Sequence, residues 1–178
     1  PHPHPHPQAG LGAALASAEN GCMSNDQRHD DQPFDLDHFL AYRVVVLADR
    51  MSRSLAQVYQ QRFGISIPEW RIIAQLNRHA PLSAREVGER TNMDKPRVSR
   101  ALARLAESGL IEREQDPRDR RVAVLDLSAE GRRLYRRIEP MAMEWQRQLL
   151  AAGGLGDGAA VHELLDRLAH SLDGVHIE

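Results

Sequence analysis

The chain has 178 residues, of which 42% are hydrophobic and only 4% aromatic, and its formal net charge is −2. The length allows one domain with a real core or two small domains, and the composition favours a helical interior packed by Ala, Leu and Val. The near-neutral charge argues against a polycation that coats nucleic acid indiscriminately. No apolar run approaches the roughly 18–20 residues of a membrane-spanning helix.

The N-terminal segment has a composition of its own. Residues 1–22 begin with alternating Pro and His and continue rich in Gly and Ala, which cannot build a packed face. We predict a flexible leader over 1–34, with a metal-binding histidine tail as the alternative for its first residues. Cys22 is the only cysteine, which excludes an internal disulfide and a zinc motif built on paired cysteines. This cysteine usage and the lack of a secretory signal favour the cytoplasm.

A long amphipathic helix is predicted next. Asp35 is a suitable N-cap, and the helix should run from Leu36 to about Arg62, before Gly64. Its apolar positions are three or four residues apart, which is the helical period. They are Leu36, Leu40, Val44, Leu47, Met51, Leu55 and Val58.

Three shorter helices follow. Ser66–Glu69 is a capping box with proline in the first turn, and it opens a helix that Pro81 ends. Ser83–Glu86 is a second capping box, for a helix over about 84–91. Asp94 is a good N-cap for the next helix, and Gly109 suits the left-handed position that ends it. Two short helices joined by a turn of three or four residues make a helix-turn-helix.

A β-hairpin is predicted after Gly109. Residues Leu110–Glu114 and Arg121–Leu127 are strand-like, and Asp116–Asp119 (Asp-Pro-Arg-Asp) between them is a turn sequence. Ser128 should cap a fifth helix, which Pro140 is able to kink. A Gly-rich hinge at 153–158 precedes a last helix over about 159–172. The apolar stripe of the fifth helix is Leu134, Ile138, Met141, Trp145 and Leu149, and that of the last is Val161, Leu164, Leu165, Leu168 and Leu172.

Basic residues concentrate on the fourth helix and the hairpin. Residues 94–121 hold eight basic and six acidic side chains, a net charge of +2, so the remainder carries −4. Lys95, the only lysine of the chain, stands at the helix start with two arginines, and three more arginines occupy the hairpin tip. A basic helix followed by a basic hairpin is how a winged helix-turn-helix presents one probe to each DNA groove.

The order of elements resembles the MarR family of bacterial transcription regulators over about 36–172. The wing carries the most specific likeness: Asp119 and Arg121 match the Asp-x-Arg pattern, and Gly131 closes it, with Ser128 where threonine is usual. Residues 63–71 also resemble the lead into that family's second helix. The resemblance implies a mainly α fold with a small β-hairpin wing, a winged helix-turn-helix over 64–127, and a helical dimerisation region over 35–63 and 128–174.

The resemblance also implies a homodimer on a pseudo-palindromic operator in double-stranded DNA. Long apolar stripes on the terminal helices support the dimer independently, because one chain of this size offers them too little partner surface. Arginine at the start of a recognition helix can grip guanine, and a wing arginine suits a narrow minor groove. Arg104, lower on the helix, is an open choice between phosphate and an intrachain pair. The DNA-contact candidates are Ser83, Arg85, Lys95, Pro96, Arg97, Ser99, Arg100, Arg104, Arg118, Asp119, Arg120 and Arg121.

The family further implies an effector pocket between the dimerisation helices and the winged domain. An aromatic carboxylate or phenol would need rings and guanidinium groups there. The wording of 63–70 resembles regulators of aromatic catabolism, including the pyridine-carboxylate type. The candidates are His38, Tyr42, Arg43, Trp70 and Arg71, with a packed core tryptophan and paired arginines as the structural alternative.

Other functions remain as alternatives. Cys22 makes a thiol-based peroxide sensor conceivable, and the histidines a metal-responsive regulator, although they lack metal-ligand spacing on one helix face. A winged helix that binds protein instead of DNA would not need arginines on both probes. No nucleophile elbow, phosphate loop or metal-ligand motif indicates an enzyme, and no cofactor is expected.

Overall fold

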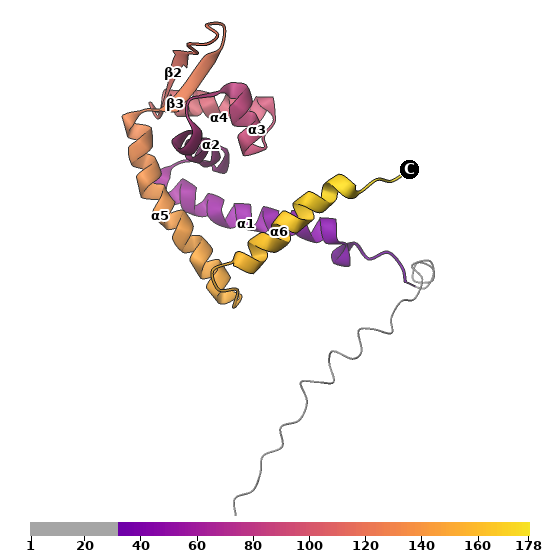
Figure 1. Cartoon of the computed structure of the whole chain (residues 1–178). Coiled ribbons are helices and arrows are strands. Elements are labelled where there is room, and N and C mark those ends of the chain that lie inside the picture. The colour runs from indigo at the N-terminus through magenta and orange to yellow at the C-terminus, as the bar shows by residue number, and fades with distance from the viewer. Residues whose placement is uncertain (1–31) are drawn as a thin grey trace, which may run out of the picture. The chain divides into compact units, whose positions relative to one another are not determined.

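The computed structural model describes residues 32–178, and the predictions for Cys22 and for the alternating histidines fall outside the described residues. The described residues divide between two units, 32–46 and 47–178, and Figure 1 shows the helices and strands along the chain. No helix in the described part has the length and apolarity needed to cross a membrane.

The first unit contains a short 3₁₀ helix, η1 (Leu36–His38), and the beginning of α1 (Leu40–Phe63). The side chain of Asp35 accepts a hydrogen bond from the backbone N–H of Asp37 at 3.0 Å, which closes one tight turn. Phe39 is extended, with φ −78° and ψ 121°. The predicted start of the long helix at Leu36 was therefore wrong by four residues, because Asp35 caps a separate turn.

In the second unit, three helices form the helix-turn-helix part as predicted: α2 (Ile67–His79), α3 (Ala84–Thr91) and α4 (Lys95–Glu107). Both capping boxes are present at the starts of α2 and α3. Asn92 ends α3 in the left-handed conformation, at φ 54°, and so turns the chain sharply into α4. Local sequence signals thus set the ends of all three helices.

The wing is a three-stranded antiparallel sheet rather than the two-stranded hairpin of the prediction. Strands β2 (Ile111–Gln115) and β3 (Ala123–Leu127) pair in the register Glu114↔Val124, and the strand order is β1-β3-β2. The additional strand, β1 (Leu82–Ser83), pairs Leu82 with Leu125. Two residues are too few to show a strand period, so β1 could not be predicted from its own residues. The mainly helical fold with a small wing is confirmed.

The core lies beneath α4. Val98, Ala101, Leu102 and Leu105 are buried, as the helical period predicted. Other buried residues come from several elements, namely Tyr59 of α1, Ile72, Ile73 and Leu76 of α2, Leu125 and Leu127 of β3, and Ile138 of α5. On α1 the fully buried position is Tyr59, one residue after the Val58 of the predicted stripe. The recognition helix is thus fixed by its apolar side and presents its polar side outward.

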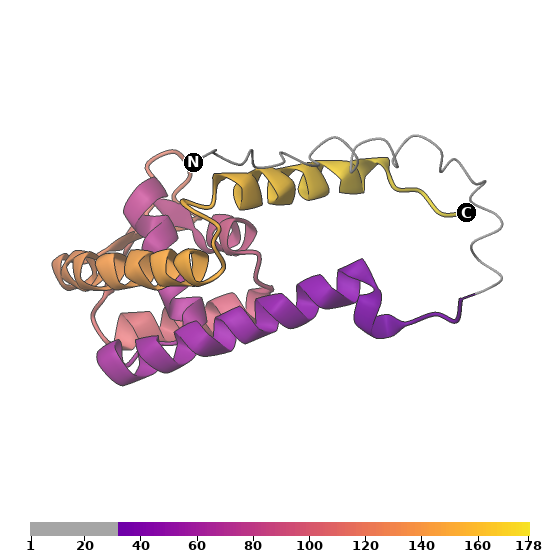
Figure 2. The ribbon, with the colours of Figure 1, turned by 90° about the horizontal axis from the view of Figure 1, so that it is seen from below.

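Two helices complete the second unit. Helix α5 (Ala129–Ala152) runs unbroken through Pro140, and α6 (Ala159–Ser171) leads into η2 (Leu172–Gly174). Figures 1 and 2 show α6 leaving the far end of α5 without lying along it. Leu164, Leu165 and Leu168 are 57%, 52% and 42% exposed. A single chain therefore leaves much of the α6 stripe uncovered, as expected from the limited surface that one chain of this size offers it.

A compact junction joins α4, the sheet and α5. The hydroxyl of Ser128 donates a hydrogen bond to the carbonyl of Gly109 at 2.7 Å and accepts one from the N–H of Gly131 at 3.1 Å. The backbone N–H of Ser128 donates to the carbonyl of Leu110 at 3.0 Å. The start of α5 is thereby tied to the end of α4.

Gly131 tests this junction. A Cβ at Gly131 would lie 2.1 Å from the carbonyl oxygen of Leu110, which is backbone and cannot rotate away. We expect Gly131→Ala to lower the free energy of unfolding by at least about 1–3 kcal/mol, as overpacking does. Urea denaturation measures it. Gly174→Ala is the control, because nothing lies within 4 Å of its added Cβ; equal stability of the two variants would contradict the prediction.

Candidate nucleic-acid interface

The start of α4 is held by its N-cap. The side chain of Asp94 accepts a hydrogen bond from the backbone N–H of Arg97 at 2.9 Å, and Pro96 lies in the first turn. Proline fits there because the first turn has no intrahelical use for its missing N–H. The backbone of the first turn of α4 is therefore rigid, which fixes the positions from which its side chains extend.

Successive residues of a helix are about 100° apart around its axis, which distributes the basic residues of α4. Arg97 and Arg104 lie on one flank of the buried face and Lys95 and Ser99 on the other, while Arg100 faces outward. All five are exposed. Among residues 32–178, Lys95, Arg97 and Arg100 have no carboxylate within ion-pair distance. Three cations at the start of α4 are thus free to meet an anionic partner.

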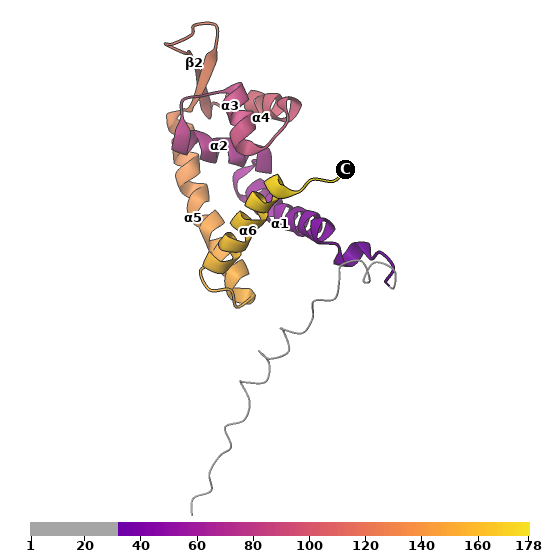
Figure 3. The ribbon, with the colours of Figure 1, turned by 45° about the vertical axis from the view of Figure 1, so that its right-hand side comes forward.

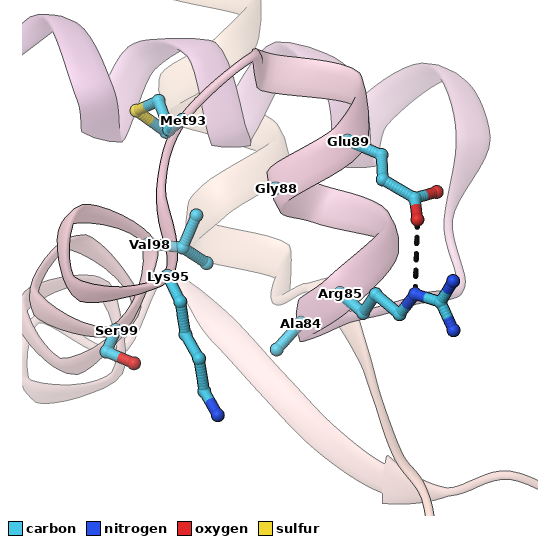
Figure 4. A pocket seen from close by; sticks show the side chains of 8 residues that line it. All are labelled: Ala84, Arg85, Gly88, Glu89, Met93, Lys95, Val98 and Ser99. Carbon is cyan, nitrogen blue, oxygen red and sulfur yellow. Dashed lines mark hydrogen bonds and ion pairs between the residues drawn. The ribbon is translucent and has the colours of Figure 1, made fainter.

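A pocket of about 490 Å³ separates α3 from α4 on the flank of Lys95. Figure 4 shows Lys95 and Ser99 of α4 facing Ala84 of α3 across it, while Arg85 turns toward Glu89 of its own helix. The Arg85 Nε lies 3.2 Å from Glu89 Oε1. The floor is apolar and the rim is cationic. Its full lining is Ala84, Arg85, Gly88, Glu89, Met93, Lys95, Val98 and Ser99.

Ser83 has a structural task at the start of α3. Its hydroxyl accepts a hydrogen bond from the N–H of Glu86 at 3.2 Å, and the Glu86 carboxylate accepts one from the N–H of Ser83 at the same distance. The predicted contacts Ser83 and Arg85 both have intrachain partners, but these partners are exposed and local. The ion pair of Arg85 with Glu89 is exposed, and pairs of this kind contribute little to stability, so Arg85 can exchange Glu89 for another anion.

The wing tip is ordered by its own aspartates. Asp116 accepts a hydrogen bond from the N–H of Arg118 at 2.9 Å, and Asp119 accepts one from the N–H of Arg121 at 3.1 Å. The backbone closes the tip with hydrogen bonds between Asp116 and Val122 at 2.9 Å and between Val122 and Asp119 at 3.0 Å. Figure 3 shows the hairpin projecting from the same end of this unit that carries α3 and α4.

Arg121 is held in a fork by Asp119. Its Nε and Nη2 donate to the two carboxylate oxygens at 3.1 and 3.2 Å, while the side chain stays 90% exposed. These hydrogen bonds, from the Arg121 side chain and then its backbone, hold the pKa of Asp119 below its ordinary value. The pair presets the direction of the arginine while leaving it accessible, as the Asp-x-Arg pattern predicted.

Arg104 differs from the other predicted contacts because its partner lies on another helix. Its Nε is 3.4 Å from Oε1 of Glu69, in the first turn of α2. The sequence analysis left Arg104 open between phosphate and intrachain pairing. In the sequence, Glu69 is recognisable only as a capping-box residue of its own helix. No sequence signal indicates that it pairs with Arg104, which lies 35 positions away.

The predicted effector residues fall in both units. His38, Tyr42 and Arg43 belong to the first, and Trp70 and Arg71 to the second. Trp70 is half-buried; its ring stacks on Tyr135 at a centroid distance of 5.8 Å and lies 5.7 Å from the ring of Tyr59. Burial raises the pKa of Tyr59, and the positive charge of Arg71 opposes that shift. Trp70 therefore has a packing role, whatever else it contacts.

Comparison with known proteins agrees with this geometry. A model of the MarR family matches residues 63–122, the helix-turn-helix and the wing. The transcriptional regulator TtmR of Methylorubrum extorquens (strain PA1) is 28% identical over 166 residues, which cover 92% of this chain and 80% of TtmR. A MarR/EmrR family regulator from Acinetobacter sp. ADP1 superposes with a TM-score of 0.71 at 27% identity, covering 80% of this chain and 100% of that one.

A further solved structure shares the fold. BpsR of Bordetella bronchiseptica, whose DNA binding is regulated by 6-hydroxynicotinic acid, superposes with a TM-score of 0.69 at 21% identity, covering 78% of this chain and 98% of its own. The fold and the two basic probes define a DNA-binding transcriptional regulator of the winged helix-turn-helix class. Residues 63–122, which hold most of its helix-turn-helix and wing, match the MarR family, and the solved regulator of that family from Acinetobacter has the same fold.

The fork between Asp119 and Arg121 leads to a prediction about titration. Because the pKa of Asp119 is lowered, the pair is intact at neutral pH and is lost only as the pH falls through that lowered value. We expect Arg121→Gln to return the pKa of Asp119 toward its ordinary 3.8, measured from carboxyl chemical shifts by NMR. Arg120→Gln is the matched control, since the hydrogen bonds to Asp119 come from Arg121. An unchanged Asp119 titration in the Arg121 variant would show that the fork does not form in solution.

Proposed function

We propose that the chain represses transcription by binding a pseudo-palindromic operator as a homodimer, with α4 in the major groove and the wing in the adjacent minor groove. The observation that carries the proposal is the pair of cationic probes at one end of the second unit. Lys95, Arg97 and Arg100 have no ion-pair partner among the described residues, and Arg118 and Arg121 of the wing are 91% and 90% exposed. The proposed contacts are Ser83, Arg85, Lys95, Pro96, Arg97, Ser99, Arg100, Arg118, Arg120 and Arg121, with Asp119 orienting Arg121.

The two probes have different roles in this proposal. Arg97 and Arg100 are placed to read base edges, because a guanidinium bonds both O6 and N7 of guanine in the major groove. Arg121 suits a narrow, AT-rich minor groove, where the negative potential is strongest. Ser83 and Arg85 lie at the start of α3, where backbone N–H groups and a cation favour phosphate.

Exposed apolar side chains support the dimer. In the first unit, Leu40 and Val44 are 57% and 46% exposed, and in the second the leucines of α6 are similarly open. A groove of about 430 Å³ between α1 and α5 is lined by Leu47, Arg50, Met51, Ser54, Trp145, Gln148 and Leu149. Apolar surfaces of this extent mark interaction sites. We assign 35–63 and 128–174 to dimerisation and 64–127 to DNA binding.

We further propose that a small aromatic carboxylate or phenol releases the operator. BpsR supports this ligand class, because it has the same fold and its DNA binding is regulated by a pyridine carboxylate. Arg43 and Arg71 have no carboxylate partner within the described residues, so each is open to a ligand carboxylate. Tyr42 and Trp70 are the proposed ring contacts, and His38 is a further candidate for contact with the ligand.

Substitutions in α4 and in the wing should impair DNA binding in different ways. We expect Arg100→Ala to relax base preference in the operator at a cost of roughly 1–3 kcal/mol, because a bidentate guanine contact is lost. Arg121→Ala should weaken binding and reduce any preference for AT-rich flanks. Selection of duplexes from a random-sequence library, followed by titration of the selected operator, measures both effects.

The control for this experiment is Arg147→Ala, whose side chain pairs with Glu144 on α5, away from both probes. Wild-type flank preference in Arg121→Ala would contradict the assignment of the wing. A wild-type protein that selects no sequence would contradict operator binding, and a monomer in light scattering at micromolar concentration would contradict the dimer.

Effector titration tests the ligand class. We expect aromatic carboxylates, with 6-hydroxynicotinic acid as the first probe, to lower operator affinity, and Arg43→Gln or Arg71→Gln to shift the response to higher concentration. A ligand moves the equilibrium only if it binds the DNA-free state more tightly. Operator affinity is measured in parallel with zinc, with zinc plus a chelator, and with an organic peroxide. A response to peroxide alone that Cys22→Ser abolishes would replace this proposal with redox sensing, and a response to zinc alone would replace it with metal sensing.

A further inference from the structure

An ion pair connects the recognition helix to the start of α2. Arg104 lies in the last turn of α4 and Glu69 in the first turn of α2, with 3.4 Å between Nε and Oε1. The Glu69 side chain is 10% exposed and that of Arg104 is 53% exposed. A pair with one well-buried member is screened less by salt than pairs in open solvent.

The carboxylate of Glu69 is held in place by its own helix, independently of Arg104. Its Oε1 accepts hydrogen bonds from the hydroxyl of Ser66 at 2.8 Å and from the N–H of Ser66 at 3.4 Å. The hydroxyl of Ser66 in turn accepts a hydrogen bond from the N–H of Glu69 at 3.3 Å. Turning Glu69 away from Arg104 would break the capping box, so the carboxylate is a rigid anchor.

The anchor acts on the rotation of α4. Its apolar side chains fix the helix against the core, and the ion pair adds a directional contact on the flank of that buried face. With side chains a helix has a radius of about 5–6 Å, so a rotation of about 20° moves a side chain by about 2 Å. That displacement exceeds the useful range of a hydrogen-bond distance. Arg97 and Arg100 share the helix with Arg104 and rotate with it.

We propose that Arg104 is a positioning residue of the recognition helix and not a phosphate contact. Glu69 holds Arg104, and this pair sets the rotation of α4 at which Arg97 and Arg100 meet base edges. The inference rests on the proposed function, because it takes α4 as the element that reads the operator. Glu69 directly precedes Trp70, so the packing of α2 on Tyr59 and Tyr135 is connected to α4 by one peptide unit and one ion pair.

Glu69→Gln is the decisive variant. Glutamine keeps the size of the side chain and serves in a capping box as glutamate does, so only the charge is removed. Loss of a negative charge should tighten DNA binding if charge alone matters. Positioning predicts the opposite, about a tenfold loss of affinity for the operator selected from a random library, which is within the range of coupled pairs. Affinity for a scrambled duplex of the same composition should not fall.

Arg104→Met gives the second measurement. We expect a similar loss of operator affinity, with the slope of log affinity against log salt unchanged from the wild type. The double variant Glu69→Gln/Arg104→Met should bind no more weakly than either single variant, because both remove the same interaction. Arg85→Ala is the reference for the slope, because Arg85 is a proposed phosphate contact, and the slope should fall by about 0.9 for each phosphate contact that a variant loses.

Three outcomes would overturn the inference: unchanged or tighter operator binding by Glu69→Gln, a lower salt slope in Arg104→Met, or additive losses in the double variant. Urea denaturation establishes that each variant is folded in the assay. If Glu69→Gln is unfolded, the operator affinity and the salt slope of Arg104→Met test the inference instead. Failure of the proposed function looks different, since the wild type itself would then not prefer the selected operator over the scrambled duplex.

Discussion

The rest of the structure depends on the junction at Ser128. One hydroxyl donates to the carbonyl of Gly109 and accepts from the N–H of Gly131, while the adjoining backbone binds Leu110. Four elements meet here: the end of α4, the beginning of β2, the end of β3 and the beginning of α5. Both DNA probes leave this point in one direction and α5 leaves it in another. A side chain at Gly131 would separate them, which is why the smallest residue stands there.

Much of the fold could be predicted because its signals are local. The capping boxes at Ser66 and Ser83, the N-cap at Asp94 and the turn at Gly109 each involve residues three or four positions apart, and all four are present. Features that depend on distant residues were missed. Strand β1 exists only because β3 pairs with it, and the pairing of Glu69 with Arg104 needs the packed helices. The start of α1 was misplaced because Asp35 caps a turn of its own.

The candidate site divides in the same way. The basic residues of α4 and the wing could be chosen from sequence, because charge and hairpin geometry are visible there. Their partners were predictable only where they are local: Asp119 lies two residues from Arg121, whereas the pairing of Arg104 with Glu69 needed the structure. The apolar stripe of α6 could be predicted from its period, but the extent of its exposure needed the structure: its leucines lie open because one chain does not supply the surface that would cover them. Each such leucine gains roughly 1.5–3 kcal/mol when it is covered.

The position of the single lysine has a practical consequence. Lys95 is the chain's only lysine, and it is exposed at the start of α4, on the rim of the pocket beside α3. Every other basic side chain in the probes is an arginine, which amine-directed reagents do not modify. The sequence therefore carries one side-chain amine, and it lies on the recognition helix. A fluorophore or photo-crosslinker attached through this side chain would report on that helix without any substitution in the protein.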